Sequence, residues 1–232
     1  MMRGNAISLP AILLNFKCYL EATGSRAVSL ARYGQEAARK HGVSIIVAPQ
    51  VADLRLVSRE TEIPVFAQHV DAITAGSHTG HVLPESVLEA GASGVIINHS
   101  ECRLQVSIIE DIISRAKDLK LKSAVCANTS KIAAAVASLE PDMIAVEPPE
   151  LIGSGIAVSK AKPEILTDTV TRIRRINNEV IILCGAGITS GEDIKSALAL
   201  GTQGVILASG VVKAKDQAAA INELAAACRQ QT

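Results

Sequence analysis

Aromatic side chains and net charge are both scarce in this sequence. It holds two Tyr, two Phe and no Trp, and its 23 Lys and Arg are balanced by 23 Asp and Glu. Proteins that bind nucleic acids use basic surfaces and aromatic side chains on which bases stack. We therefore expect no nucleic-acid partner, and a core built from Ile, Val, Leu and Ala.

Long apolar runs are missing as well. No run approaches the roughly 20 residues that a membrane-spanning helix needs. The first ten residues, MMRGNAISLP, lack the apolar segment of a secretory signal. We therefore expect a cytoplasmic protein that does not associate with a membrane.

Cysteines at metal-ligand spacing are also absent. The five cysteines are scattered, odd in number and never arranged as C-x-x-C. This pattern argues against a disulfide framework or a zinc site and favours a reducing compartment. We expect these residues to be small buried side chains. They are Cys18, Cys102, Cys126, Cys184 and Cys228.

What the sequence does contain is a repeated alternation of short apolar runs and longer amphipathic segments. The runs are almost wholly apolar, as in parallel strands that helices cover on both faces. Eight such strands are predicted, over residues 11–16, 44–48, 65–68, 94–98, 123–126, 143–147, 180–184 and 204–208.

Helices are predicted after these strands. Ser25 is the expected N-cap of one helix, and Gly42 its end. The clearest helical segments cover residues 25–42, 104–120, 130–140, 162–177, 190–201 and 215–230. With no linker or compositional break, the pattern predicts a single α/β domain over residues 1–232, a (β/α)₈ barrel. A doubly wound open sheet is the alternative, although no G-x-G-x-x-G follows the first strand.

Polar and titratable residues gather where three of the predicted strands end. Asn15 and Lys17 lie at the end of the first strand, His99 and Glu101 follow the fourth, and Glu147 lies at the end of the sixth. Each alone is compatible with an ordinary loop residue. In a barrel, however, the carboxyl ends of all strands surround one site. A cation, an imidazole and a carboxylate are therefore expected to face a common centre.

Glycine-rich loops follow the last two predicted strands. They read CGAGITSGED, from Cys184, and LASGVVKAKD, from Leu207. Small residues allow backbone N–H groups to approach an anion, and barrels commonly bind phosphate after strands seven and eight. Gly and Ser also form ordinary turns, so each loop alone is ambiguous. The segment from Pro148 is too long for a simple turn and is typical of a lid.

Five motifs in register at strand ends resemble those of the triosephosphate isomerase family, in its short archaeal form. They are NFK, NHSE, AVEPPELIGSG, GAGI and ILASGVVKAKD, and the resemblance extends over residues 11–217. The lid lacks the aromatic residue of the longer bacterial and eukaryotic enzymes. ASG also stands where those enzymes have paired glycines. Both features match the archaeal form.

The resemblance implies an aldose–ketose isomerase of glycolysis and gluconeogenesis that works without metal or organic cofactor. Its substrates would be dihydroxyacetone phosphate and glyceraldehyde 3-phosphate. Glu147 would be the general base and His99 a neutral electrophile. Lys17 would offset negative charge, Asn15 would orient oxygens, and Glu101 would position Lys17. The backbone groups expected to hold the phosphate are those of Ile152, Gly153, Gly187, Ala208 and Ser209.

Two other functions are compatible with parts of the pattern. A non-catalytic phosphate-binding barrel would keep the fold, and another phosphate-using barrel enzyme would keep the phosphate loops. The presence of Glu147, His99 and Lys17 together argues against both.

Three histidines lie between the third and fourth predicted strands. His69, His78 and His81 could suggest a metal site, but no carboxylate or cysteine completes a convincing ligand set. In the resembling family this loop reaches into a neighbouring subunit. The resemblance therefore implies a homodimer or homotetramer that assembles through the loop around Thr79.

Overall fold

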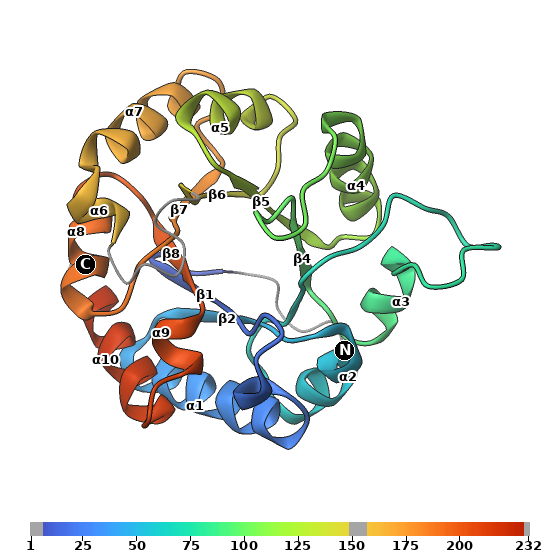
Figure 1. Cartoon of the computed structure of the whole chain (residues 1–232), viewed down its shortest axis with the longest axis horizontal. Coiled ribbons are helices and arrows are strands. Elements are labelled where there is room, and N and C mark those ends of the chain that lie inside the picture. The colour runs from blue at the N-terminus through green and yellow to red at the C-terminus, as the bar shows by residue number, and fades with distance from the viewer. Residues whose placement is uncertain (1–6, 149–156, 230–232) are drawn as a thin grey trace.

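The computed structural model describes residues 7–148 and 157–229. Eight parallel strands form one sheet in the order β2-β1-β8-β7-β6-β5-β4-β3. Helices surround the sheet, and the strands converge on a common centre (Figure 1). The strands are β1 (Ala11–Asn15), β2 (Ser44–Ala48), β3 (Phe66–Ala67), β4 (Gly94–Ile97), β5 (Lys122–Ala127), β6 (Met143–Val146), β7 (Ile181–Cys184) and β8 (Gly204–Leu207).

The two ends of this strand order meet, so the sheet forms a barrel. Val47 in β2 bridges Val65 in parallel fashion just before β3. The Val47 N–H also donates to the Pro64 carbonyl at 3.1 Å. The (β/α)₈ barrel predicted from the sequence is therefore confirmed. The third strand is shorter than predicted, since only two of its residues join the ladder with β4.

Two apolar layers hold the barrel together. Alternate residues of every strand fill the inside, including Leu13, Ile46, Phe66, Ile96 and Leu183. The intervening strand residues pack outward against the helices in a second, larger cluster. Because strand side chains alternate between faces, nearly every strand residue is buried and the runs are apolar throughout.

The helices follow the strands as the alternation of the sequence predicts. They are the 3₁₀ helix η1 (Leu20–Ala22), α1 (Ser25–His41), α2 (Val51–Glu60), α3 (Pro84–Glu89), α4 (Val106–Asp118), α5 (Ser130–Ala137), α6 (Val158–Ala161), α7 (Pro163–Arg174), α8 (Gly191–Ala199), α9 (Ser209–Val212) and α10 (Gln217–Arg229). Among the described residues, none of these helices is both long and apolar enough to cross a membrane.

The start of α1 differs from the prediction. Ser25 is the first helical residue, and Gly24 is the N-cap, with φ of 62°. No side chain caps this end of the helix. A left-handed backbone suits glycine, so conformation rather than a hydroxyl acceptor decides where the helix begins. Gly42 ends the helix as expected, with φ of 68° and its N–H bonded to the Ala38 carbonyl.

Candidate active site

A cavity of about 240 Å³ opens at the carboxyl ends of the strands. It brings together every predicted site residue that the structure describes: Asn15, Lys17, His99, Glu101, Glu147, Gly187, Ala208 and Ser209. Ile152 and Gly153, also predicted to contact the phosphate, lie outside the described residues. Residues more than 190 positions apart in the sequence thus face one small volume.

Lys17 enters this cavity through a bend at the end of β1. Its backbone has φ of 47°, in the left-handed region that non-glycine residues rarely adopt. Two hydrogen bonds hold it there. The Lys17 N–H donates to Asn15 Oδ1 at 2.9 Å, and Gln68 Nε2 donates to the Lys17 carbonyl at 3.0 Å. Asn15 therefore fixes the turn that carries Lys17.

The ammonium of Lys17 forms an ion pair with Glu101. Its Nζ lies 2.8 Å from Glu101 Oε1, and the Lys17 side chain is 14% exposed. Among the described residues that line the cavity, Lys17 is the single Lys or Arg. Positive charge in the cavity is thus concentrated on one atom whose position Glu101 restrains.

His99 reaches the cavity because Asn98, directly after β4, ends the extended backbone of that strand. Asn98 has φ of 60°, and its side chain bonds both sides of the turn. Its Nδ2 donates to the Cys126 carbonyl at 3.0 Å, and its Oδ1 accepts from the Leu104 N–H at 2.9 Å. These contacts turn the chain so that His99 lines the cavity, where it is 6% exposed.

The hydrogen bonding of His99 fixes its tautomer. The Glu101 N–H donates to His99 Nδ1 at 3.2 Å. A backbone N–H can only donate, so Nδ1 must carry a lone pair and the neutral ring carries its proton on Nε2. That nitrogen lies on the side of Glu147, 3.6 Å from Glu147 Oε2. The cavity therefore receives a neutral imidazole N–H donor.

Glu147 follows β6 and is buried, with 7% of its surface exposed. Its backbone N–H is bonded to the Ala127 carbonyl at 2.8 Å. Its Oε2 is buried and has no hydrogen-bond partner among the described residues. A buried carboxylate oxygen without a partner is costly, and such atoms point to a functional role.

Gly185, just after β7, provides the space for Glu147. A Cβ added at Gly185 would overlap Glu147 Cγ and lie 2.8 Å from Ile206 Cγ2. Any side chain here would therefore displace the carboxylate from its position beside His99. No local feature of the sequence indicates this role of Gly185.

The cysteines divide into two groups. Cys126, Cys184 and Cys228 are buried as predicted, whereas Cys18 and Cys102 are exposed, so for these two the prediction was wrong. Burial, together with the neighbouring Glu147 carboxylate, raises the pKa of Cys126 well above its ordinary value and that of Cys184 to about 12. Both thiols next to the site are therefore protonated and unreactive at neutral pH.

The other wall of the cavity is made of backbone. Ala186 and Gly187 have φ of 67° and 71°, which turns the chain sharply after β7. After β8, α9 begins at Ser209. The N–H groups of Ser209 and Gly210 precede the first bond inside α9, in which the Val211 N–H donates to the Ala208 carbonyl. This wall can therefore offer N–H donors to an anion.

Two cavity residues with polar side chains were not predicted from the sequence. Tyr19 lines the cavity, with Lys213 Nζ 5.0 Å from its ring centroid. Thr189 lines it from the turn after β7. Neither residue stands out in the sequence. Each is brought to the site by the turn that comes just before a helix, Tyr19 before η1 and Thr189 before α8.

Two other features of the described residues do not form a competing site. No group of three or more His, Cys, Asp or Glu side chains there is arranged to hold a metal ion. A larger cavity, of about 760 Å³, lies at the amino ends of β5, β6 and β7. Its lysines are engaged in ion pairs, Lys117 with Glu140 at 3.1 Å and Lys122 with Asp142 at 2.6 Å. The predicted site residues lie at the opposite end of the strands.

Comparisons with known proteins agree with this geometry. The family model described as triosephosphate isomerase matches residues 10–225. Proteins named triosephosphate isomerase from Methanothermus fervidus, Methanothermobacter thermautotrophicus and Methanocaldococcus jannaschii are 54%, 52% and 51% identical to this chain. The alignments cover 93%, 93% and 92% of this chain, and 97%, 94% and 97% of the relatives. The chain therefore belongs to the triosephosphate isomerase family.

Proposed function

We propose that this protein interconverts dihydroxyacetone phosphate and D-glyceraldehyde 3-phosphate through an enediolate. The observation that carries the proposal is the buried Glu147 carboxylate. Its Oε2 has no hydrogen-bond partner in the part of the chain that the structure describes, and it faces the neutral His99 ring 3.6 Å away. One group can remove a proton from carbon while the other donates to the neighbouring carbonyl oxygen. Both are needed at once for enolisation.

The proton transfers assign a role to each group. Glu147 removes a proton from the hydroxyl-bearing carbon next to the carbonyl and delivers it to the former carbonyl carbon. His99 Nε2–H donates its proton to the oxygen on which negative charge develops, and Nε2 takes up the hydroxyl proton of the other oxygen, so that the hydroxyl and the carbonyl exchange places. Lys17 offsets that charge and part of the phosphate charge, and Asn15 orients the substrate oxygens. Each step moves only protons, so the reaction requires no metal or organic cofactor.

Glu101 supports this arrangement from two directions. Its carboxylate lies 2.8 Å from Lys17 Nζ, and its backbone N–H donates to His99 Nδ1. It therefore restrains the cation and fixes the tautomer of the electrophile. We assign Glu101 a positioning role, because neither contact requires it to touch the substrate.

The phosphate would bind at the backbone wall. The N–H groups of Gly187, Ala208 and Ser209, which line the cavity, are the candidate donors, and Lys17 supplies the nearby charge. A neutral protein can hold a dianion in this way, because the donors are local. Ile152 and Gly153 remain predicted further donors, outside the described residues.

The test is a coupled assay of the purified chain in both directions, followed by Glu147→Gln. The wild type is expected to turn over both triose phosphates, and the variant to lose most activity while keeping its far-ultraviolet circular dichroism. Glu140→Gln, an exposed residue at the other end of the strands, is the matched control. A wild type that binds phosphate but isomerises neither sugar would favour the non-catalytic barrel instead.

Subunit assembly and cellular location are further parts of this proposal. We propose that the chain acts as one domain, in a homodimer or homotetramer formed through the exposed loop around Thr79, which projects from the barrel beside α3 (Figure 1). Free cysteines support a reducing, cytoplasmic location. Light scattering across a range of concentrations tests the assembly, and Thr79→Arg is expected to weaken it. If the wild type and Thr79→Arg show the same oligomeric mass at every concentration, this interface is contradicted.

A further inference from the structure

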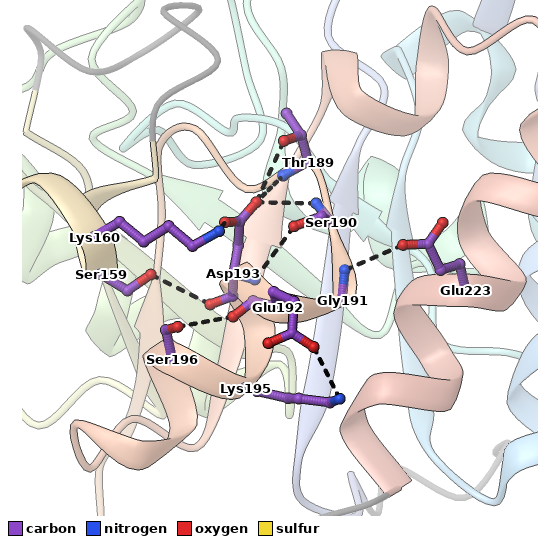
Figure 2. A network of polar contacts seen from close by, with 10 residues as sticks. All are labelled: Ser159, Lys160, Thr189, Ser190, Gly191, Glu192, Asp193, Lys195, Ser196 and Glu223. Atoms are coloured by element: carbon purple, nitrogen blue, oxygen red, sulfur yellow. Dashed lines mark hydrogen bonds and ion pairs between the residues drawn. The ribbon is translucent and has the colours of Figure 1, made fainter.

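Asp193 is a buried carboxylate next to the cavity that no step of the proposed reaction uses. It is the third residue of α8 and is 4% exposed. Its Oδ2 accepts from the Thr189 N–H at 3.0 Å, from the Ser190 N–H at 3.0 Å and from Thr189 Oγ1 at 3.3 Å. Figure 2 shows these contacts converging on one oxygen.

The second oxygen of Asp193 reaches a different element. Its Oδ1 lies 2.7 Å from Lys160 Nζ, in α6 (Figure 2). Ser159, also in α6, donates its hydroxyl to the Asp193 main-chain carbonyl at 3.3 Å. Asp193 thus connects three pieces of the molecule: α6, α8 and the turn that follows β7.

Helix capping explains only part of this network. In a capping box the third helical residue needs to accept only from the N-cap backbone, here Ser190. Asp193 also engages both polar groups of Thr189 and the ammonium of Lys160. Burial opposes ionisation of Asp193, but Lys160 and the loop N–H groups outweigh it and lower its pKa below the ordinary value. The carboxylate is therefore ionised at neutral pH.

The turn that Asp193 restrains forms the backbone wall of the cavity. Ala186, Gly187, Ile188 and Thr189 all line it. Ala186 holds an unfavourable left-handed φ of 67°, so surrounding contacts must maintain the turn. The turn also touches the start of α9, since a Cβ on Gly210 would lie 2.9 Å from the Ile188 carbonyl. Fixing Thr189 therefore fixes the spacing between the two parts of this wall.

We propose that Asp193 and Lys160 are a positioning pair, which holds the turn after β7 in the conformation that binds the substrate phosphate. Neither residue is among those that line the cavity. The inference rests on the proposed function for the identity of the phosphate ligand. It adds two residues outside the predicted site, and it assigns α6 a part in shaping the phosphate wall.

The experiment compares D193N, K160M, K160R and the control K195M. Lys195 lies on the same helix as Asp193, and its ammonium pairs with Glu192 at 3.0 Å. Two quantities are measured: the dissociation constant for inorganic phosphate, by NMR titration, and kcat/KM for glyceraldehyde 3-phosphate against unphosphorylated D-glyceraldehyde. The second substrate has the same reacting carbons but cannot use the phosphate wall.

D193N is expected to weaken phosphate binding by about tenfold, the effect of losing one charge-assisted contact. It should lower kcat/KM for the phosphorylated substrate to a similar extent and leave D-glyceraldehyde almost unchanged. K160M should act in the same direction but less strongly, because the Lys160 side chain is 52% exposed and water screens its charge. K160R and K195M should resemble the wild type. The double variant D193N/K160M should be little worse than D193N.

Other outcomes separate this inference from the proposed function. Unchanged phosphate affinity in D193N and K160M, or an equal loss for both substrates, would overturn the positioning role and leave a structural helix cap. Absence of phosphate binding to the wild type would overturn it as well. If D193N does not fold, K160M alone tests the positioning role, since the Lys160 side chain is half-exposed and its replacement should not prevent folding. A wild type whose phosphate affinity depends on this pair but that isomerises neither triose phosphate would refute only the proposed function.

Discussion

The two walls of the cavity are built on different principles. One wall, the side-chain wall, presents Lys17, His99 and Glu147 from the ends of β1, β4 and β6. The other, the backbone wall, presents the turn after β7 and the start of α9, from Gly187 to Thr189 and from Ala208 to Gly210. The first presents titratable side chains to the cavity, and the second presents main chain.

This difference determines how each wall can be altered. A single substitution removes a titratable group from the side-chain wall. The N–H groups of the backbone wall remain present after almost any substitution. Mutations can therefore test this wall only through the side chains that hold it in place, such as Asp193 and Lys160. We therefore expect losses of turnover that are large on one side, and losses confined to phosphate binding on the other.

The largest effect is expected from Glu147→Gln. The amide has the shape of the carboxylate but cannot accept the carbon-bound proton. We expect kcat to fall by about 10²–10⁴-fold, the usual contribution of a general base. Affinity for inorganic phosphate should stay close to that of the wild type. A large loss of phosphate affinity would mean that the two walls are not separate.

Lys17→Met should affect both walls, because the Lys17 ammonium is the single Lys or Arg charge among the described cavity-lining residues. The methionine keeps the apolar stem but removes the charge. We expect kcat/KM to fall by about 10²–10³-fold, with weaker binding of phosphoglycolate measured by calorimetry. Lys117→Met, at the other end of the strands, is the control. Unchanged affinity for phosphoglycolate would exclude Lys17 as a phosphate contact.

Gly185→Ala tests a direct link between the walls. The added Cβ would overlap Glu147 Cγ, so the carboxylate must move. A displacement near 1 Å can cost about a hundredfold in rate. We therefore expect kcat to fall by about that factor while KM changes little. Wild-type kcat in a correctly folded Gly185→Ala variant would show that the position of Glu147 does not depend on this glycine.

The smallest effect concerns pH and Asp193. Its pKa is lowered in the folded protein, so its stabilising contribution is complete above the ordinary value of 3.8 and is lost as pH falls through the lower folded value. D193N should therefore cost about 1 kcal/mol of unfolding free energy at pH 7. The difference from wild type should shrink below about pH 4. Urea midpoints from pH 7 to pH 3 measure this, and a difference that persists in acid would contradict it.

Much of the side-chain wall could be predicted from sequence. The apolar runs before Asn15, Asn98 and Glu147 indicate buried strands, and a barrel brings their ends together. The pairing of Lys17 with Glu101 is present in the structure, at 2.8 Å. The roles of these residues remain predictions until they are tested by substitution.

The backbone wall was harder to predict because its chemistry is independent of residue type. Glycine-rich loops indicate where an anion can approach, but they do not say which N–H groups are available. The contacts of Asp193 with Thr189, and the space that Gly185 leaves for Glu147, depend on residues far apart in the chain. Neither has a local sequence signal.

The eight-stranded alternation can be read from the sequence, because burial on both faces forces apolar runs, and so can the titratable residues at the strand ends. The directions in which those side chains point depend on contacts between distant residues. The left-handed turns at Lys17 and Asn98 redirect their side chains, and the Glu101 N–H selects the tautomer of His99. Turns and hydrogen bonds of this kind depend on contacts across strands, which are set only when the barrel has closed.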